Sequence, residues 1–193
     1  MCGRIEYLLE LSDLIDYYDL PDEEEFLTDV SASEEVFPTQ SLLTLTANKK
    51  IIPMNWGLRA SWTKQRIINT RLETAEVKQL SAQAFETRRC IIPVSGFYEW
   101  DENKQKHIIY QDDKVMSLAG VYNLVQNIEG QAEPVFSVLT KDSYDKMQQI
   151  HNRVPVILPQ GFSERYLDHQ TPIIALKKSL MQFKMPLNID RVS

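Results

Sequence analysis

The segment from Cys90 to Thr140 restricts the possible folds more than any other part of this sequence. It contains five short stretches of β-branched, aromatic and aliphatic residues separated by polar residues, a pattern typical of strands. These stretches are Cys90–Val94, Phe97–Trp100, His107–Tyr110, Val115–Val125 and Val135–Thr140. Asn127–Gly130 predicts a hairpin turn between the last two. Because helices do not alternate regularly with these strands, we expect an α+β fold with a mainly antiparallel sheet.

Further elements are predicted on both sides of this strand-rich segment. Ser12–Tyr18 combines an N-cap residue with helical spacing of apolar side chains, so we expect a short helix there. The other predicted elements are strands over Leu42–Ala47 and Lys50–Trp56 joined at Asn48–Lys49, helices over Thr74–Phe85 and Ser143–Ile150, and a strand over Val154–Leu158. The 193 residues contain no linker-like tract, so we expect a single domain over residues 1–193.

The composition argues against several classes of protein. No apolar run approaches the ~20 residues that a membrane helix needs, and the first residues lack signal-peptide features. We therefore expect a cytoplasmic protein without a membrane partner. Cys2 and Cys90 are too few for a disulfide framework and are expected to be free thiols. His107, His151 and His169 are scattered without zinc spacing, so we expect no metal and no other cofactor.

The formal charge is distributed unevenly along the chain. Residues 1–48 contain one basic and twelve acidic residues, giving −11, and residues 49–193 contain 20 basic and 15 acidic residues, giving +5. The acidic run Asp22–Glu25 is expected to lie in a solvated loop. Because binding depends on the local potential within a Debye length of ~10 Å, a basic face can exist despite the net charge of −6. The charge distribution therefore neither excludes nor favours a nucleic-acid partner.

Cys2 carries the most distinctive chemistry in the sequence. We expect Met1 to be removed because the second residue is small, which leaves an α-amine and a thiol on the same residue. The pKa of an α-amine is about 7.7–8.0, so part of it is nucleophilic near neutral pH. The amine can condense with an aldehyde to an imine, and the thiol can then close a thiazolidine ring intramolecularly. Considered alone, Cys2 is more simply interpreted as a small buried hydrophobic residue whose place after Met1 is a coincidence.

Five motifs in order change this interpretation. They are Met1-Cys2-Gly3-Arg4, Pro38-Thr39-Gln40, Asn55-Trp56-Gly57-Leu58 continuing through Trp62 to Asn69-Thr70-Arg71-Leu72-Glu73, Arg89-Cys90-Ile91-Ile92-Pro93-Val94-Ser95-Gly96-Phe97-Tyr98-Glu99-Trp100, and Ile150-His151-Asn152-Arg153-Val154-Pro155. Together they resemble the SRAP family (SOS-response-associated peptidase), the abasic-site-processing proteins. Each motif alone is weak, but the set extends over most of the chain.

The resemblance implies both a fold and an activity. It implies a barrel-like antiparallel core with flanking helices, and a monomer that binds abasic sites in single-stranded DNA and associates with the nucleoid. The open-chain sugar of an abasic site is an aldehyde, which is the electrophile that a terminal aminothiol captures. Cys2 aligns with the crosslinking residue, Glu99 with a proton-shuttling carboxylate, His151 with a second acid/base group and Asn69 with the residue that orients the linkage.

The same resemblance implies a set of DNA contacts. Arg4, Arg71 and Arg153 match positions expected to bind phosphates, and Trp56 is a candidate for stacking on an unpaired base. The residues expected to line the channel also include Pro38 and Thr140. Core packing for Trp56 and solvation for any single arginine are the alternative interpretations.

Two other functions compete with the crosslinking hypothesis. In a cysteine-type peptidase or hydrolase, Cys2 attacks an acyl group with His151 as the base. In a non-catalytic binder of single-stranded DNA, Cys2 is dispensable. The crosslinking hypothesis also includes a lyase-type imine intermediate. The word peptidase in the family name suggests that the protein removes Met1 by autoproteolysis. We nevertheless expect a methionine aminopeptidase to be enough to remove this single residue.

Overall fold

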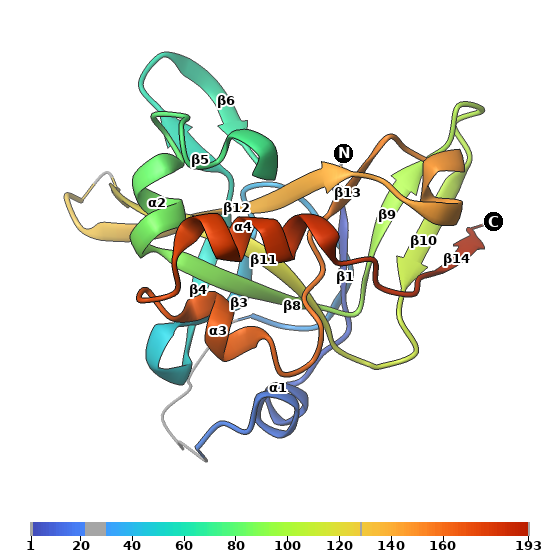
Figure 1. The fold of residues 1–193 in the computed structure, drawn as a ribbon, viewed down its shortest axis with the longest axis horizontal. Helices are drawn as coiled ribbons and strands as arrows, with labels where there is room; N and C mark the ends of the chain where they lie inside the picture. The colour runs from blue at the N-terminus through green and yellow to red at the C-terminus, as the bar shows by residue number, and fades with distance from the viewer. Residues whose placement is uncertain (1, 22–29, 128, 193) are drawn as a thin grey trace.

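A closed five-stranded β-barrel forms the centre of the molecule (Figure 1). The computed structural model describes residues 2–21, 30–127 and 129–192. The barrel strands are β3 (Ser41–Thr46), β4 (Lys50–Trp56), β8 (Arg89–Val94), β11 (Met116–Gln126) and β12 (Ala132–Asp142). They pair in the order β11–β8–β3–β4–β12, and pairing of β12 with β11 closes the barrel. These pairs are antiparallel except for β4–β12.

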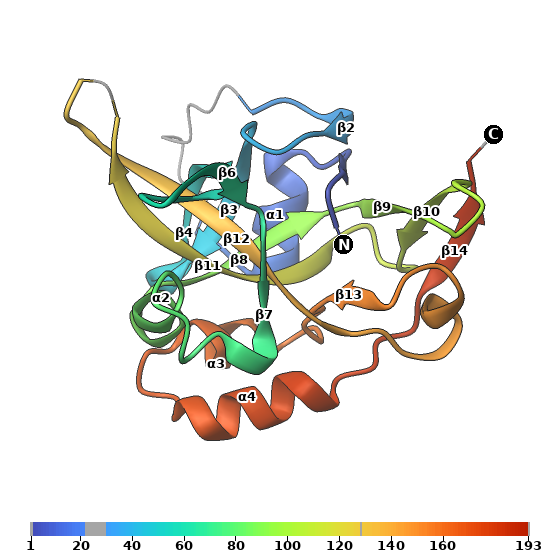
Figure 2. The ribbon, with the colours of Figure 1, turned by 90° about the horizontal axis from the view of Figure 1, so that it is seen from above.

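A second, antiparallel sheet lies at one end of the barrel, on the side of the C-terminus (Figures 1 and 2). Its order is β14 (Asn188–Arg191), β10 (Lys106–Tyr110), β9 (Gly96–Trp100), β1 (Ile5–Tyr7) and β2 (Ser33–Val36). The short strands β7 (Asn69–Arg71) and β13 (Arg153–Pro155) pair with the last part of β12. The hairpin of β5 (Leu58–Ala60) and β6 (Thr63–Ile67) projects from the barrel (Figure 1).

Helices cover the outside of the barrel. The α-helices are α1 (Leu11–Tyr18), α2 (Ala82–Thr87), α3 (Ser163–Leu167) and α4 (Ile173–Gln182), and the 3-10 turns are η1 (Ala47–Lys49), η2 (Leu72–Thr74) and η3 (Asp145–Gln149). In Figure 2, α2, α3 and α4 lie together on one side of the barrel. The buried Arg89 guanidinium links two of these helices to β8, because it donates to the carbonyl oxygens of Phe85 at 2.8 Å and Tyr166 at 2.5 Å.

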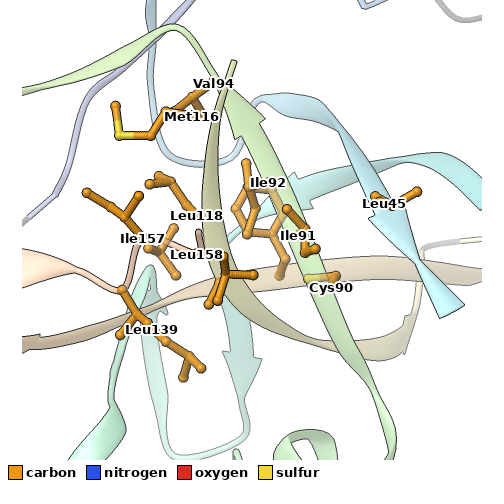
Figure 3. Close-up of a cluster of buried hydrophobic side chains, with 14 of the residues drawn as sticks. Leu45, Cys90, Ile91, Ile92, Val94, Met116, Leu118, Leu139, Ile157 and Leu158 are labelled. Carbon is orange, nitrogen blue, oxygen red and sulfur yellow. The ribbon is translucent and has the colours of Figure 1, made fainter. Parts of the chain in front are cut away.

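Buried hydrophobic side chains from several barrel strands form one cluster, part of which is shown in Figure 3. All six residues of β8 are buried, and because both faces of this strand are covered, the five residues that follow Arg89 form a continuous apolar run. Cys90 is fully buried in this cluster, and burial raises the pKa of its thiol far above the usual range. This burial disfavours the thiolate, which is the reactive form of a cysteine.

The predicted fold class is confirmed, including the barrel-like core and the flanking helices. The predicted strands of the barrel agree with β3, β4, β8, β11 and β12 to within a few residues, and the turn after β11 joins it to its antiparallel partner β12. The helix predicted for Ser12–Tyr18 corresponds to α1. The acidic run Asp22–Glu25 lies outside the described residues.

Two helix predictions are wrong. Within Thr74–Phe85 only the residues from Ala82 onward are α-helical, because the Ser81 hydroxyl donates to the Ala75 carbonyl at 2.8 Å and stabilises a non-helical turn. Ser143–Ile150 contains the 3-10 turn η3 instead of an α-helix. Its first residue, Asp145, has a φ of 48°, which a right-handed helix does not allow.

Candidate functional site

Cys2 is held in place by a barrel-attached strand. Its side chain is buried, and its carbonyl oxygen accepts a hydrogen bond of 2.7 Å from Nδ2 of Asn69. Asn69 is the first residue of β7 and lies opposite Val138 of β12 in a parallel pair. The barrel therefore fixes the position of the Cys2 backbone. In Figures 1 and 2 the segment that leads into β1 lies beside β9 and β13.

Glu99 approaches the cysteine from β9. This strand pairs with β1, and the Tyr98 amide donates to the Arg4 carbonyl at 2.9 Å. Glu99 itself is 4% exposed. Burial, and secondly the negative charge of Glu99, raise the pKa of the Cys2 thiol well above its usual range. The thiol is therefore protonated at neutral pH and needs a proton acceptor before it can act as a nucleophile.

His151 lies in the turn between η3 and β13. Its Nδ1 atom accepts a hydrogen bond of 2.9 Å from the Arg153 amide. Nδ1 also lies 3.3 Å from the Arg153 carbonyl oxygen. Because the shorter contact is to a backbone N–H, which can only donate, we infer that a neutral His151 ring carries its proton on Nε2.

Two of the three predicted phosphate-binding arginines are accessible to a ligand. Arg71 is exposed at the end of β7. The side chain of Arg4 is 29% exposed and donates to Glu35 at 2.8 Å. The Arg4 guanidinium lies over the rings of Phe37 and Trp100, at 4.2 Å and 5.1 Å from their centroids.

Arg153 is already occupied by protein groups. Its two terminal nitrogens donate to the two carboxylate oxygens of Glu73, both at 2.8 Å, and one also donates to Asp142 at 2.6 Å. The other donates to the Thr140 carbonyl at 2.7 Å, and Thr140 is fully buried. The predicted phosphate contact of Arg153 and the predicted channel position of Thr140 do not fit these environments.

The stacking role predicted for Trp56 does not fit its position either. Trp56 is fully buried, its ring stacks on Phe136 with a centroid distance of 6.2 Å, and its Nε1 donates to the Ile68 carbonyl at 3.0 Å. It is a core residue, the alternative that the sequence left open. Pro38 is partly exposed in the turn between β2 and β3, where the adjacent Thr39 amide donates to the Trp56 carbonyl at 2.8 Å.

Trp62 has no predicted DNA contact, but it is an exposed tryptophan beside the site. It lies between β5 and β6 and is 62% exposed. It lines a cavity of about 510 Å³ together with Asn69, Arg71 and Lys78. The available signal was its place in the sequence between Trp56 and Asn69, at the turn of a short polar hairpin, where a large aromatic side chain has no core to enter.

The described residues contain neither a metal-binding cluster nor a membrane-spanning helix. No group of three or more His, Cys, Asp or Glu side chains within residues 2–21, 30–127 and 129–192 is arranged to hold a metal ion. Among the helices of those same ranges, none is long and apolar enough to cross a membrane.

The fold and the site together define an α+β barrel protein with a buried cysteine near its N-terminus, bound by an asparagine and adjacent to a buried glutamate. The sequence profile of the SOS response associated peptidase (SRAP) family matches residues 1–193. The chain therefore belongs to the SRAP family.

Several relatives and solved structures are similar to this chain. "Abasic site processing protein YoqW" of Bacillus subtilis is 28% identical over 197 residues, covering 94% of this chain and 87% of that protein. "Abasic site processing protein HMCES" of Mus musculus is 25% identical over 152 residues, covering 58% of this chain and 43% of that protein. A crystal structure from Bacteroides thetaiotaomicron has a TM-score of 0.87 at 22% identity and covers 100% of this chain and 92% of its own, which supports the fold.

Proposed function

We propose that this protein binds abasic sites in single-stranded DNA and captures them covalently through Cys2. The observation that carries the proposal is the hydrogen bond between Asn69 and the Cys2 carbonyl, in a site where the Glu99 charge acts on the Cys2 thiol. The names of relatives that are similar over most of the chain support the same substrate. The chemistry requires a free α-amine on Cys2 and therefore removal of Met1.

The reaction proceeds by two additions to one carbon. The Cys2 amine attacks the aldehyde carbon of the open-chain sugar, and the resulting carbinolamine loses water to form an imine. The thiol then adds across the carbon–nitrogen double bond: sulfur bonds to carbon, and the thiol proton moves to nitrogen. One water is released, and no oxidant or reductant is needed. The product is a thiazolidine that links the protein to the DNA.

The raised pKa of the thiol supports one order of these steps. Because the buried thiol is protonated, the amine attacks first, and the thiol reacts after a base has accepted its proton. Glu99 is proposed to accept a proton from the attacking amine, to donate it to the departing water, and then to accept the thiol proton. His151, with its exchangeable proton on Nε2, is the proposed second acid/base group.

Asn69 is proposed to orient the aminothiol. Its Nδ2 binds the Cys2 carbonyl, and its Oδ1 is buried with no hydrogen-bond partner among the described residues. An unpaired buried acceptor is costly, and the Cys2 amine is a donor on the same residue that Asn69 already binds. A hydrogen bond from the amine to Oδ1 would aim the amine lone pair at the aldehyde.

The DNA path is proposed to cross the cavity beside the site. Arg71 and Arg4 provide accessible cations, and Trp62 provides an exposed ring face for an unpaired base. Arg153 acts as a structural cation that positions β13 and His151 instead of binding phosphate. We propose that the protein acts as a monomer.

The cysteine hydrolase is the less supported alternative. Such an enzyme needs a thiolate, which is favoured by nearby positive charge. Here burial and the Glu99 carboxylate both disfavour the thiolate form of Cys2.

The test is a denaturing gel of the mature protein mixed with a single-stranded oligonucleotide that carries one abasic site. Mass spectrometry first verifies that Met1 is absent. We expect a slow band with the abasic strand, no such band with an intact strand or with Cys2→Ala, and an unchanged band with Cys90→Ala. A protein with a free Cys2 amine that gives no band refutes the proposal. A band that persists in Cys2→Ala assigns the linkage to another residue.

A further inference from the structure

Arg4 shares one carboxylate with a second cation. Glu35 of β2 accepts a hydrogen bond of 2.8 Å from Nη1 of Arg4 through one oxygen, and its other oxygen accepts from Nζ of Lys106. The Arg4 Nε atom is buried and has no hydrogen-bond partner in the described part of the chain. Arg4 therefore makes a single hydrogen bond to Glu35, which leaves its capacity for two parallel bonds to an anion unused.

This pair contrasts with the other arginine–carboxylate pair of the site. Arg153 and Glu73 form two parallel hydrogen bonds, and the Arg153 side chain is only 10% exposed. Arg4 and Glu35 are 29% and 30% exposed, so solvent and a ligand can reach both. Glu73 is as exposed as Glu35, so the difference lies in the arginines: the Arg4 guanidinium is more accessible to an incoming anion than that of Arg153.

The aromatic residues around Arg4 decide which partner moves. The guanidinium lies over both Phe37 and Trp100, which restrain it through cation–π contacts. The Glu35 side chain is held through its ion pairs with Arg4 and Lys106. A phosphate can therefore reach Arg4 by replacing the carboxylate of Glu35 while the guanidinium keeps its place over the two rings.

We propose that Glu35 is a specificity-determining residue that lowers the affinity of Arg4 for the phosphates of undamaged DNA. This inference rests on the proposed function. A surface ion pair is weak enough to be exchanged, but the displaced carboxylate stays close to the bound phosphate and repels it. Intact strands then dissociate readily, whereas an abasic strand is retained by its covalent bond. Selectivity for damage comes from weak non-covalent binding followed by covalent capture.

The first experiment measures binding of an intact single-stranded oligonucleotide by fluorescence anisotropy. Glu35→Gln is expected to bind about three- to tenfold tighter than the wild type at ~0.1 M salt. Glu34→Gln is the matched control, because it removes the same charge from the next residue, which is exposed and points to the other face of β2. Unchanged or weaker binding by Glu35→Gln, or an equal gain in Glu34→Gln, refutes the inference.

A double-mutant cycle tests whether the effect passes through Arg4. The gain from Glu35→Gln is expected to be smaller in an Arg4→Gln background, since Lys106 is then the one remaining partner that Glu35 is known to hold among the described residues. A gain of the same size in that background shows a general charge effect and overturns the role assigned to Glu35.

A competition assay then connects Glu35 to selectivity. Crosslinking to an abasic strand is timed with and without an excess of intact strand, and the excess is expected to slow Glu35→Gln more than the wild type. If the wild type forms no crosslink but Glu35→Gln binds intact DNA tighter, the proposed function fails and the role of Glu35 remains. The opposite outcome is a wild type that forms the crosslink and a Glu35→Gln variant that binds intact strand with the same affinity and is slowed by it to the same extent. In that case only the role of Glu35 fails.

Discussion

The side-chain amide of Asn69 donates a hydrogen bond of 2.7 Å to the backbone carbonyl of Cys2, a residue 67 positions earlier in the sequence. Asn69 is itself fixed by the pairing of β7 with β12. The barrel thereby orients a residue close to the N-terminus, where a chain is usually mobile. An amine and a thiol that act in sequence on one carbon need this restraint, because misorientation slows both additions.

Replacing Asn69 therefore slows crosslinking without weakening DNA binding. Asn69→Ala removes one hydrogen bond of about 1 kcal/mol, and we expect a rate about five- to tenfold lower. Asn69→Asp places a carboxylate oxygen against the Cys2 carbonyl, so its rate is expected to be lower still. The rates are measured on denaturing gels at saturating protein, and binding by anisotropy on an intact strand. A wild-type rate in Asn69→Asp contradicts this role.

Truncation of the two tryptophans near the site is expected to affect different properties: DNA binding for Trp62 and stability for Trp56. Trp62→Ala removes an exposed ring and should weaken binding of single-stranded DNA by about 1–3 kcal/mol, with little effect on the melting temperature. Trp56→Ala removes a buried ring packed on Phe136 and should lower the free energy of unfolding by about 3–5 kcal/mol. Anisotropy and thermal denaturation of both variants check the assignment. Unchanged DNA binding by Trp62→Ala removes the stacking role.

These tryptophans also show the limit of prediction from sequence. Strand alternation and turn residues are local, so the barrel strands were predictable, and the motifs identified Cys2, Asn69 and Glu99 as candidates. The environment of a side chain depends on distant partners. Trp56 is buried because Phe136 and the Ile68 carbonyl meet it, and neither contact is visible in its own motif.

Arg153 illustrates the same limit for charge. Its carboxylate partner Glu73 is 80 residues away in the sequence, and the two meet because η2 and β13 both lie against β12. A basic residue in a DNA-binding motif predicts a phosphate contact equally well whether or not such a partner exists. The C-terminal elements α4 and β14 were not predicted, since α4 directs only Leu176 and Leu180 into the core and β14 depends on pairing with β10.

The Glu73–Arg153 pair is expected to stabilise the fold in a pH-dependent way. Burial raises the pKa of Glu73, but the hydrogen bonds and charge of Arg153 outweigh this effect and leave the pKa below its usual value. The stabilisation is therefore present above the unfolded pKa of about 4.3 and is lost as the pH falls through the lower folded pKa.

Glu73→Gln tests this contribution. We expect it to lower the free energy of unfolding by about 1–3 kcal/mol near pH 7, a figure discounted because Glu73 is 31% exposed. The difference from the wild type should shrink as the pH falls from about 5 to below 4. Urea denaturation at several pH values measures it, with Glu34→Gln as the surface control. A difference that is constant with pH excludes the ion pair as its source.

Glu99→Gln is expected to separate the reactivity of the Cys2 thiol from crosslinking. Removing the negative charge of Glu99 takes away one of the two causes that raise the pKa of the thiol, so Cys2 should be alkylated faster by iodoacetamide at pH 8. Crosslinking should nevertheless slow by about 10²- to 10⁴-fold, because the proton carrier is lost. Peptide mapping of protein lacking Met1 follows both reactions, and the fully buried Cys90 is the internal control that stays unmodified. Crosslinking at the wild-type rate would show that Glu99 carries no proton, and a parallel loss of intact-strand binding would assign it a structural role.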